Sequence, residues 1–179
     1  AVGFLGVNVR TTPLSMEEGR ALAAATAQVT WPDSVLIAAV ARYDSPTHGF
    51  DRPDRLTYYY LNARNEVLRI TYLNGDRFST DIHAYETEDE LDFSLLQPLP
   101  AGMSSYQAPA TTANDAGGGR LRADIAAGVV RVFLTWPKDR AVPMYSVTIG
   151  RPRLLTLRRF CCFDGRTGEA QPGATWTVP

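Results

Sequence analysis

Three short runs of aromatic and β-branched residues between Arg55 and His83 constrain the fold more than any other feature of the 179-residue chain. Residues of these types favour strands, and turn-forming residues separate the runs. The sequence therefore predicts a three-stranded antiparallel meander with strands at 55–62, 67–73 and 77–83. Asn74-Gly75 tolerates positive φ at both central positions of a type I′ turn, so we expect it to close the second hairpin.

The third run alternates in polarity, which is typical of a strand with one buried face. Phe78, Thr80 and Ile82 would pack, whereas Asp81 and His83 would share the solvated face. Two such side chains can reach one proton or one metal ion, so they form a candidate acid–base pair or two-ligand metal site. A zinc site needs three or four ligands, and we therefore favour plain solvent exposure for both residues.

A helix is predicted before the meander, from Met16 to Val29. Ser15 and Glu18 have the spacing of a capping box, in which each side chain satisfies a backbone N–H at the helix start. Thr30-Trp31-Pro32 would end the helix, because proline disfavours helical geometry in the residue before it. The stripe expected to face the sheet is narrow and consists of Gly19, Leu22, Ala23, Thr26 and Val29.

The segment from Val35 to Tyr43 is apolar enough for a buried strand. Its alanines at 38, 39 and 41 leave a helix as the alternative. Residues 44–54 are rich in Asp and Pro and would form a loop that leads to the meander. These elements together make the first predicted unit, residues 1–83.

Residues 84–119 differ in character from the chain before them. They open with an acidic run and end with three successive glycines. Small and polar residues between 108 and 119 indicate a flexible connection or a long surface loop. We therefore expect 84–119 to be a connection between two structural units.

The second predicted unit, residues 120–179, repeats part of the first. An amphipathic stretch precedes Thr135-Trp136-Pro137, just as the first helix precedes Thr30-Trp31-Pro32. Its apolar positions have helical spacing and are Leu121, Ile125, Val129 and Val132. The β-branched residues of 129–134 leave a strand as the alternative.

The end of the chain is predicted to be β-structure. Strands are expected at 144–149 and 154–163, followed by a tight turn at 164–169 and a short final strand. Asp, Gly and Thr in the turn favour a hairpin at this point.

That last hairpin is written Phe163-Asp164-Gly165-Arg166-Thr167-Gly168-Glu169. With a helix and strands before it, the second unit resembles the small PepSY-type domains, many of which close with a strand, an Asp-x-x-Thr-Gly-Glu turn and another strand. Asp164, Thr167, Gly168 and Glu169 match that turn, and the resemblance covers mainly residues 120–170. It implies a cystatin-like helix-on-sheet shape, repeated in tandem, and an extracytoplasmic module that binds or inhibits a protein partner. It brings no catalytic residues.

Charge is distributed unevenly along a chain whose net charge is −1. Residues 1–119 carry a net charge of −7 and residues 120–179 a net charge of +6. The two parts could attract each other, or the basic part could face an acidic partner. The arginines expected to contact a protein partner are Arg151, Arg153, Arg158 and Arg159. No nucleic acid partner is expected, because exposed aromatic residues do not alternate with these arginines.

Cys161 and Cys162 are the two cysteines of the chain. Neighbouring residues of a strand point to opposite faces, and a bond between them would strain the peptide, so we expect no intrachain disulfide. The apolar run from Ala1 to Val7 is too short to span a bilayer. It would be a first strand or the remnant of a removed signal or membrane anchor.

Three successive tyrosines, Tyr58, Tyr59 and Tyr60, would place rings on both faces of one strand. Tyr58 and Tyr60 are expected in the core. Tyr59 is either a half-buried amphipathic residue or a contact for a partner, because tyrosine is enriched at interfaces. We therefore include Tyr59 among the candidate partner-binding residues.

No phosphate-binding loop, nucleophile elbow, zinc spacing or dinucleotide fingerprint is present, so no catalytic residue, metal or cofactor is expected. The expected protein is α+β, with two helix-on-antiparallel-meander units. It would be a non-catalytic protein-binding module, an extracytoplasmic (periplasmic or cell-surface) accessory subunit that docks on a protein partner such as a membrane protein complex. A segment upstream of Ala1 could anchor it. The alternatives are a small enzyme that uses Asp81 and His83 in a cleft between the units, and a structural subunit of a phage or envelope assembly.

Overall fold

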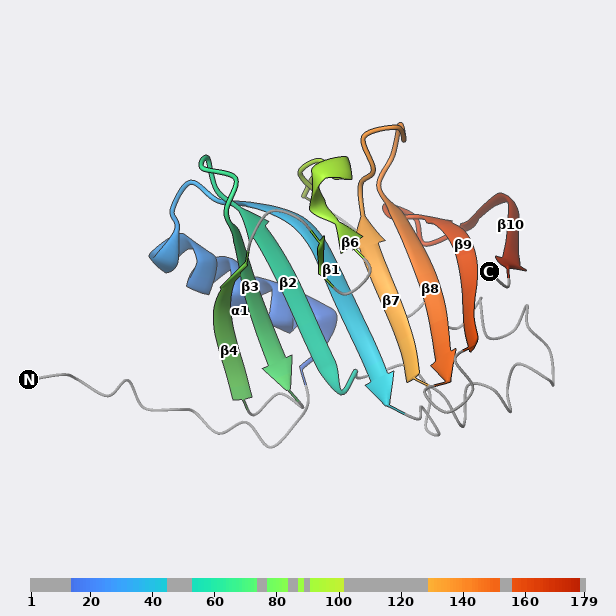
Figure 1. Cartoon of the computed structure of the whole chain (residues 1–179), viewed down its shortest axis with the longest axis horizontal. Coiled ribbons are helices and arrows are strands. Elements are labelled where there is room, and N and C mark those ends of the chain that lie inside the picture. Colours follow the sequence, from blue (N-terminus) through green and yellow to red (C-terminus); the bar gives the residue numbers. More distant parts are fainter. Residues whose placement is uncertain are drawn as a thin grey trace, which may run out of the picture.

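The computed structural model describes residues 14–44, 53–73, 77–83, 87–88, 91–101, 129–151 and 156–177. One helix, α1 (Met16–Thr30), lies against a large antiparallel sheet (Figure 1). The sheet has the order β10-β9-β8-β7-β1-β2-β3-β4. Its strands are β1 (Val35–Asp44), β2 (Arg55–Leu61), β3 (Val67–Leu73), β4 (Arg77–His83), β7 (Val129–Thr135), β8 (Met144–Arg151), β9 (Thr156–Asp164) and β10 (Ala170–Thr177).

Three short elements complete the fold and lie on the other face of the sheet from α1 (Figure 1). They are β5 (Thr87–Glu88), which pairs with β6 (Leu91–Asp92), and the 3₁₀ helix η1 (Phe93–Leu95). We call the face that carries α1 the helix face and the opposite one the open face. The α+β class is thus as expected.

The arrangement differs from the two expected helix-on-meander units. The described residues contain one α-helix, and a single sheet runs through both predicted units. The sheet consists of two four-stranded meanders, β1 to β4 and β7 to β10. Their first strands, β1 and β7, pair antiparallel at the centre in continuous register from Ala38↔Thr135 to Asp44↔Val129. The proposed boundaries at 84 and 119 stay predictions, and the sheet hydrogen bonds cross from one unit to the other.

The segment 129–135 forms strand β7, so of the two alternatives that the sequence left open for Val129 and Val132 the strand is the one observed. Val130, Val132 and Leu134 are all at most 1% exposed and belong to the core cluster of the helix face, as expected for residues two apart in a strand. The β-branched residues therefore decided the local structure. Leu121 and Ile125 lie outside the described residues.

The alanine-rich segment from Val35 is the central strand β1 rather than a helix. It has a hydrogen-bonded neighbour on each side, β2 and β7, and it is buried on both faces. Strands buried on both faces have continuous apolar sequences. On the helix face Ala39 lies in register between Tyr58 and Leu134, so a small residue in β1 leaves room for large neighbours.

The helix α1 begins with the predicted capping box: Ser15 N donates to Glu18 Oε2 at 2.9 Å, and Glu18 N donates to Ser15 Oγ at 3.3 Å. Its buried stripe is rotated from the predicted one. Leu22 is 40% and Val29 is 87% exposed, whereas the buried residues are Met16, Gly19, Ala23 and Ala27. Small side chains bring the helix close to β2 and β3, whose tyrosines Tyr58, Tyr60 and Tyr72 are buried in the same cluster.

The contact between the start of α1 and the sheet is close and polar. Tyr58 Oη donates a hydrogen bond to the carbonyl oxygen of Met16 at 2.9 Å. Tyr145 of β8 donates to Met16 Sδ at 3.7 Å. Met16 therefore joins tyrosines from both halves of the sheet.

Residues 91–99 were expected to belong to a connection, but they pack against the sheet, with Leu91, Phe93 and Leu96 on the open face and Leu99 against the core of the helix face. Leu91, Phe93 and Leu96 are at most 8% exposed and form a cluster with side chains of β1, β2, β3 and β7. Backbone bonds hold this segment where β1 and β7 diverge: Leu99 N donates to Leu36 O at 2.8 Å, and Lys138 N donates to Leu95 O at 2.8 Å. We call residues 91–99 the plug.

The hairpin turns agree in part with the sequence. Leu73 pairs with Arg77, so three residues join β3 to β4, one more than the expected two-residue type I′ turn contains; residues 74–76 lie outside the described residues. The turn after β9 is tight, as expected. Asp164 Oδ1 accepts from Arg166 N at 2.7 Å and from Thr167 N at 3.1 Å, and Gly168 has a φ of 75°, a conformation that glycine adopts without strain.

Substitution of Gly19 tests the close helix contact. A Cβ at this position would lie 2.7 Å from Tyr58 Oη and 2.8 Å from Leu56 Cδ1. Helix propensity alone would make Gly19→Ala stabilising by ~1 kcal/mol, but overpacking of this kind typically costs about 1–3 kcal/mol. We expect a net loss of stability in urea unfolding. The loss should shrink in a Tyr58→Phe background, which removes the hydroxyl in the way, and an equal loss in both backgrounds would contradict this packing.

Two buried tyrosines, Tyr60 and Tyr72, make the stability of the fold sensitive to alkaline pH. Burial raises the pKa of Tyr60 to about 12 from its ordinary 10; Tyr72 adds to the rise and Arg20 opposes it. Burial also raises the pKa of Tyr72, against a hydrogen bond with Thr26. The fold favours both neutral phenols, so their contribution is complete below pH 10 and is lost as the pH rises towards 12.

We therefore expect the free energy of unfolding to fall above pH 10, by up to ~1.4 kcal/mol per pH unit for Tyr60, with a change of the same sign from Tyr72. Urea titrations of the native protein and of Tyr60→Phe at several alkaline pH values measure this dependence. The variant should show the shallower slope. Identical slopes would contradict the role given to Tyr60.

Candidate binding surfaces

A row of arginines crosses the open face of the sheet. Arg42 of β1 pairs in register with Arg55 of β2 on one side and with Arg131 of β7 on the other. Arg131 pairs with Thr148 of β8, which in turn pairs with Arg159 of β9. Arg55, Arg42, Arg131 and Arg159 thus share one line across five strands, and we call them the arginine row.

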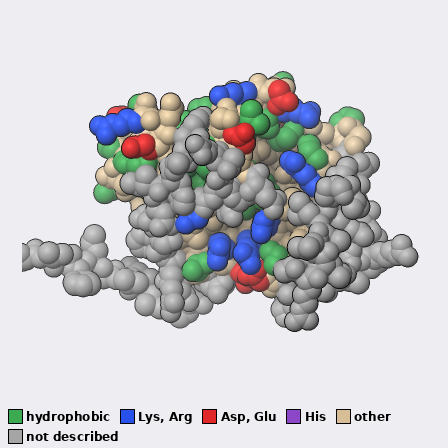
Figure 2. All heavy atoms as spheres, in the orientation of Figure 1, with side chains coloured by type: hydrophobic (Ala, Val, Ile, Leu, Met, Phe, Trp, Pro, Cys, Tyr) green, Lys and Arg blue, Asp and Glu red, His purple; other side chains and the backbone are tan. Residues whose placement is uncertain are grey.

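Strand alternation places this row on the open face. Arg42 is two residues from Val40, and Arg131 is two residues from Phe133. Val40 and Phe133 contact the plug, and residues two apart in a strand point to the same face. Figure 2 shows Lys and Arg side chains gathered on this face beside acidic ones.

The arginines of the row are reachable from solvent. Arg55 and Arg159 are exposed, and Arg131 is partly buried. Arg42 is 31% exposed, and its Nε lies 2.8 Å from Asp44 Oδ1, with Asp44 53% exposed. Arg159 Nη2 donates to Ser146 Oγ at 3.4 Å.

Cross-strand neighbours of equal charge destabilise a sheet, and here three arginines are adjacent. The Arg42–Asp44 pair is exposed to solvent and offsets little of this repulsion. The row therefore places several positive charges side by side on one line of the open face.

The two edges of the sheet differ. Strand β4 is the last strand on one side, is seven residues long and contains neither proline nor glycine. The other edge, β10, contains Pro172 and Gly173, and its pairing with β9 shifts register between Ala170 and Thr175. Proline and bulges protect an edge against further pairing, so β10 is blunted and β4 is not.

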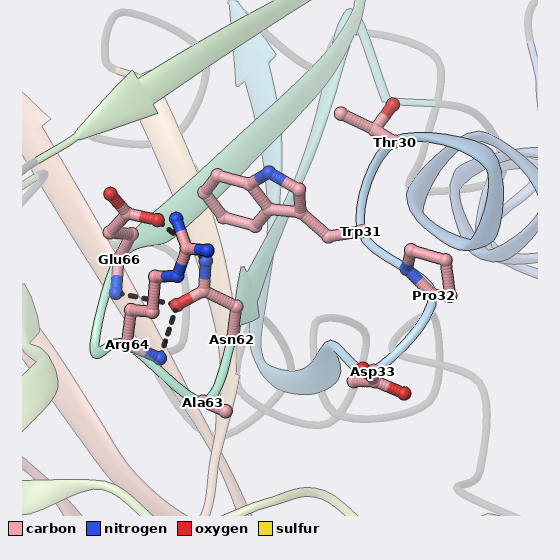
Figure 3. A pocket seen from close by; sticks show the side chains of 8 residues that line it. All are labelled: Thr30, Trp31, Pro32, Asp33, Asn62, Ala63, Arg64 and Glu66. Carbon is pink, nitrogen blue, oxygen red and sulfur yellow. Dashed lines mark hydrogen bonds between the residues drawn. The ribbon is translucent and has the colours of Figure 1, made fainter.

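A pocket of about 240 Å³ lies between the α1–β1 connection and the β2–β3 loop (Figure 3). Trp31 lies on one side, and Asn62, Arg64 and Glu66 lie on the other. The loop is held by Asn62, whose Oδ1 accepts from the backbone N of Arg64 and of Glu66, both at 2.9 Å. Asn62 Nδ2 also donates to Glu66 Oε2 at 2.7 Å. The side chains of Asn62 and Glu66 are therefore engaged in holding the β2–β3 loop.

The structure corrects the expectation for Tyr59. This side chain is 0% exposed, and its ring centroid lies 5.1 Å from that of Phe93 in the plug. The plug residues come from a segment expected to be a connection, so their covering of Tyr59 was missed. Tyr59 therefore presents no ring to a partner.

The other predicted site residues are only partly described. Arg159 belongs to the arginine row, as shown above. The strands place the backbones of Arg151 and Arg158, whereas their side chains and the whole of Arg153 lie outside the described residues. Asp81 and His83 lie in register opposite Arg69 and Val67, and their side chains also lie outside the described residues.

The cysteines differ from the expectation. Cys161 and Cys162 are adjacent in β9, and the structure places their two Sγ atoms against each other. The expectation assumed strict strand alternation, but the pairing of β8 with β9 shifts register at this point, because Tyr145 pairs with Phe163 and Ser146 with Cys161. Such a bulge breaks the alternation on which the argument depended.

Two features are absent from the part of the chain that the structure describes. Within it, no three or more His, Cys, Asp or Glu side chains are grouped so that they could hold a metal ion. No helix in that part has both the length and the apolar character needed to cross a membrane.

Comparison with known proteins leaves the family open. No protein-family model, curated protein sequence or solved structure matches the chain. The resemblance to PepSY-type domains therefore stays a prediction, as do the partner and the location it implies.

Sequence reasoning missed the arginine row because its members come from four separate strands. One local feature does indicate the face of each arginine, since Arg42 and Arg131 each lie two residues from an apolar residue of the same strand. Recognising the row also requires the pairing of β1 with β7, which joins residues 89 positions apart in Arg42 and Arg131 and has no local signature.

The loop interpretation of the pocket predicts the effect of Asn62→Ala. This change removes the Nδ2 donor to Glu66 and the Oδ1 oxygen that accepts two backbone hydrogen bonds. At a partly exposed site, such a loss lowers the free energy of unfolding by about 1–2 kcal/mol in total. Thermal or urea unfolding measures the loss. Asn65→Gly in the same loop is the matched control, because Asn65 has a φ of 59° that glycine adopts readily, and it should leave stability nearly unchanged. Equal losses in the two variants would contradict the role of Asn62.

Proposed function

We propose that this protein is a non-catalytic protein-binding module, an extracytoplasmic or membrane-associated accessory subunit that docks on a protein partner. The observation that carries the proposal is the edge strand β4 (Arg77–His83), because no strand of the described residues pairs with its outer side. The location is taken from the resemblance to PepSY-type domains.

An edge strand can bind a partner through its backbone alone. Its outward N–H and C=O groups form a template for one further strand, and this supplies affinity without special side chains. A partner that contributes an extended segment would extend the sheet beyond β4. The blunted strand β10 limits such pairing to one side of the sheet.

Rigidity of the strand favours this use. β4 pairs with β3 in continuous register from Val67↔His83 to Leu73↔Arg77. β3 is itself packed under α1, with Ile70 0% exposed. A template held in this way loses little conformational freedom on binding, which favours affinity.

A pair of proline variants tests the proposal. Successive residues of an antiparallel strand direct their N–H groups alternately towards the two neighbours, so Ser79→Pro and Thr80→Pro remove one inner and one outer donor. The inner variant should lose stability by ~3 kcal/mol or more, whereas the outer variant should unfold almost like the native protein. Urea unfolding identifies which is which.

The stable variant is then used in affinity capture from the native organism, beside the unmodified protein. We expect proteins retained by the unmodified chain to be lost by the outer proline variant. Equal retention by both chains, or no specific retention by the unmodified chain, would contradict docking at β4.

A further inference from the structure

We propose that the arginine row binds an extended acidic segment of the protein partner. This inference rests on the proposed function, since it names the chemistry of the segment that the module recognises. It concerns the open face and not the free backbone edge of β4: strand β3 separates Arg55, the member of the row nearest to β4, from that edge.

The dimensions of the row fit an extended peptide. Adjacent strands lie about 4.8 Å apart, and four strand spacings separate Arg55 from Arg159, so the row is roughly 19 Å long. An extended chain advances about 3.3 Å per residue, and the row therefore matches about six residues that cross the strands. Leu73, 38% exposed, pairs with Arg55 and adds an apolar contact at one end.

The side chains of the row suit carboxylates. A guanidinium group offers paired N–H donors in one plane and binds a carboxylate through two hydrogen bonds. Arg42 uses Nε towards Asp44, and this bond does not involve its two terminal nitrogens. A bound carboxylate would also reduce the repulsion between Arg42 and its neighbours Arg55 and Arg131.

The origin of the four arginines strengthens the inference. Arg42 and Arg55 come from residues 1–119, whose net charge is −7, and Arg131 and Arg159 come from the basic remainder. An acidic part of the chain thus contributes half of a basic row. The row is a local feature of the folded sheet and does not follow from the charge of either part.

A protein segment fits this face better than a nucleic acid or a membrane. Tyr59 and Phe93, large aromatic side chains on this face, are buried against each other and offer no platform on which bases could stack. Leu73 is the one exposed large hydrophobic residue in line with the row among the described residues, which is too little for insertion into a lipid surface.

The test uses a fluorescein-labelled hexaglutamate peptide and the full chain, with binding followed by anisotropy in low-salt buffer. Arg55→Gln, Arg131→Gln and the double variant remove charges from the row. Arg140→Gln is the matched control, because it removes the same charge from an exposed arginine in the β7–β8 loop. We expect saturable binding that weakens about tenfold for each arginine removed from the row. The control should stay within about twofold of the native protein, as expected for a charge outside the contact.

A stability measurement separates binding from folding. Arg55→Gln removes one of two adjacent like charges, so its melting temperature should equal or exceed that of the native protein. The inference is overturned if the peptide does not bind, if Arg140→Gln weakens binding as much as Arg55→Gln does, or if an oligothymidylate binds more tightly than the peptide. The last result would assign the row to phosphate polyanions.

Failure here is distinguishable from failure of the proposed function. A protein that loses its captured partner in the outer β4 proline variant but does not bind hexaglutamate retains the proposed function and lacks this recognition. If the row variants lose peptide binding while both β4 variants keep the partner, recognition of acidic peptides stands and docking at β4 fails.

Discussion

The antiparallel pairing of β1 with β7 is the interaction on which the rest of the structure depends. It joins two meanders that are distant in the sequence through their first strands, and it turns them into one sheet. The helix face gains a shared core in this way, because Met16 at the start of α1 contacts Tyr58 of one meander and Tyr145 of the other. The arginine row exists for the same reason, since Arg42 and Arg131 become neighbours only through this pairing.

Each face of the sheet is completed differently. On the helix face, Gly19 and Ala23 are small enough to let α1 approach the tyrosines of β2 and β3 closely, and the large rings of these tyrosines are buried beneath the helix. On the open face, the plug fills the place where β1 and β7 diverge and buries Tyr59 under Phe93. Beyond the plug the open face is polar, and its arginines remain in contact with solvent.

The sequence predicted local structure well where one residue type dominated. The capping box at Ser15 and Glu18, the strands of the meander and the turn after Asp164 all follow from backbone chemistry within a few residues. The strand at 129–135 was left open between two periodicities, and its β-branched residues match the outcome. The helix stripe was misplaced because Leu22 and Val29 are more hydrophobic than Ala27, whereas close approach of the helix to the sheet favours small side chains.

The unpredicted features all depend on long-range pairing. No local signal indicates that β1 and β7 meet, that residues 91–99 cover Tyr59, or that four arginines align. The most direct measurement of the pairing is a nuclear Overhauser spectrum of the α-protons. The account predicts cross-strand contacts that alternate along the register from Ala38↔Thr135 to Asp44↔Val129. Contacts within each meander without any between β1 and β7 would contradict it.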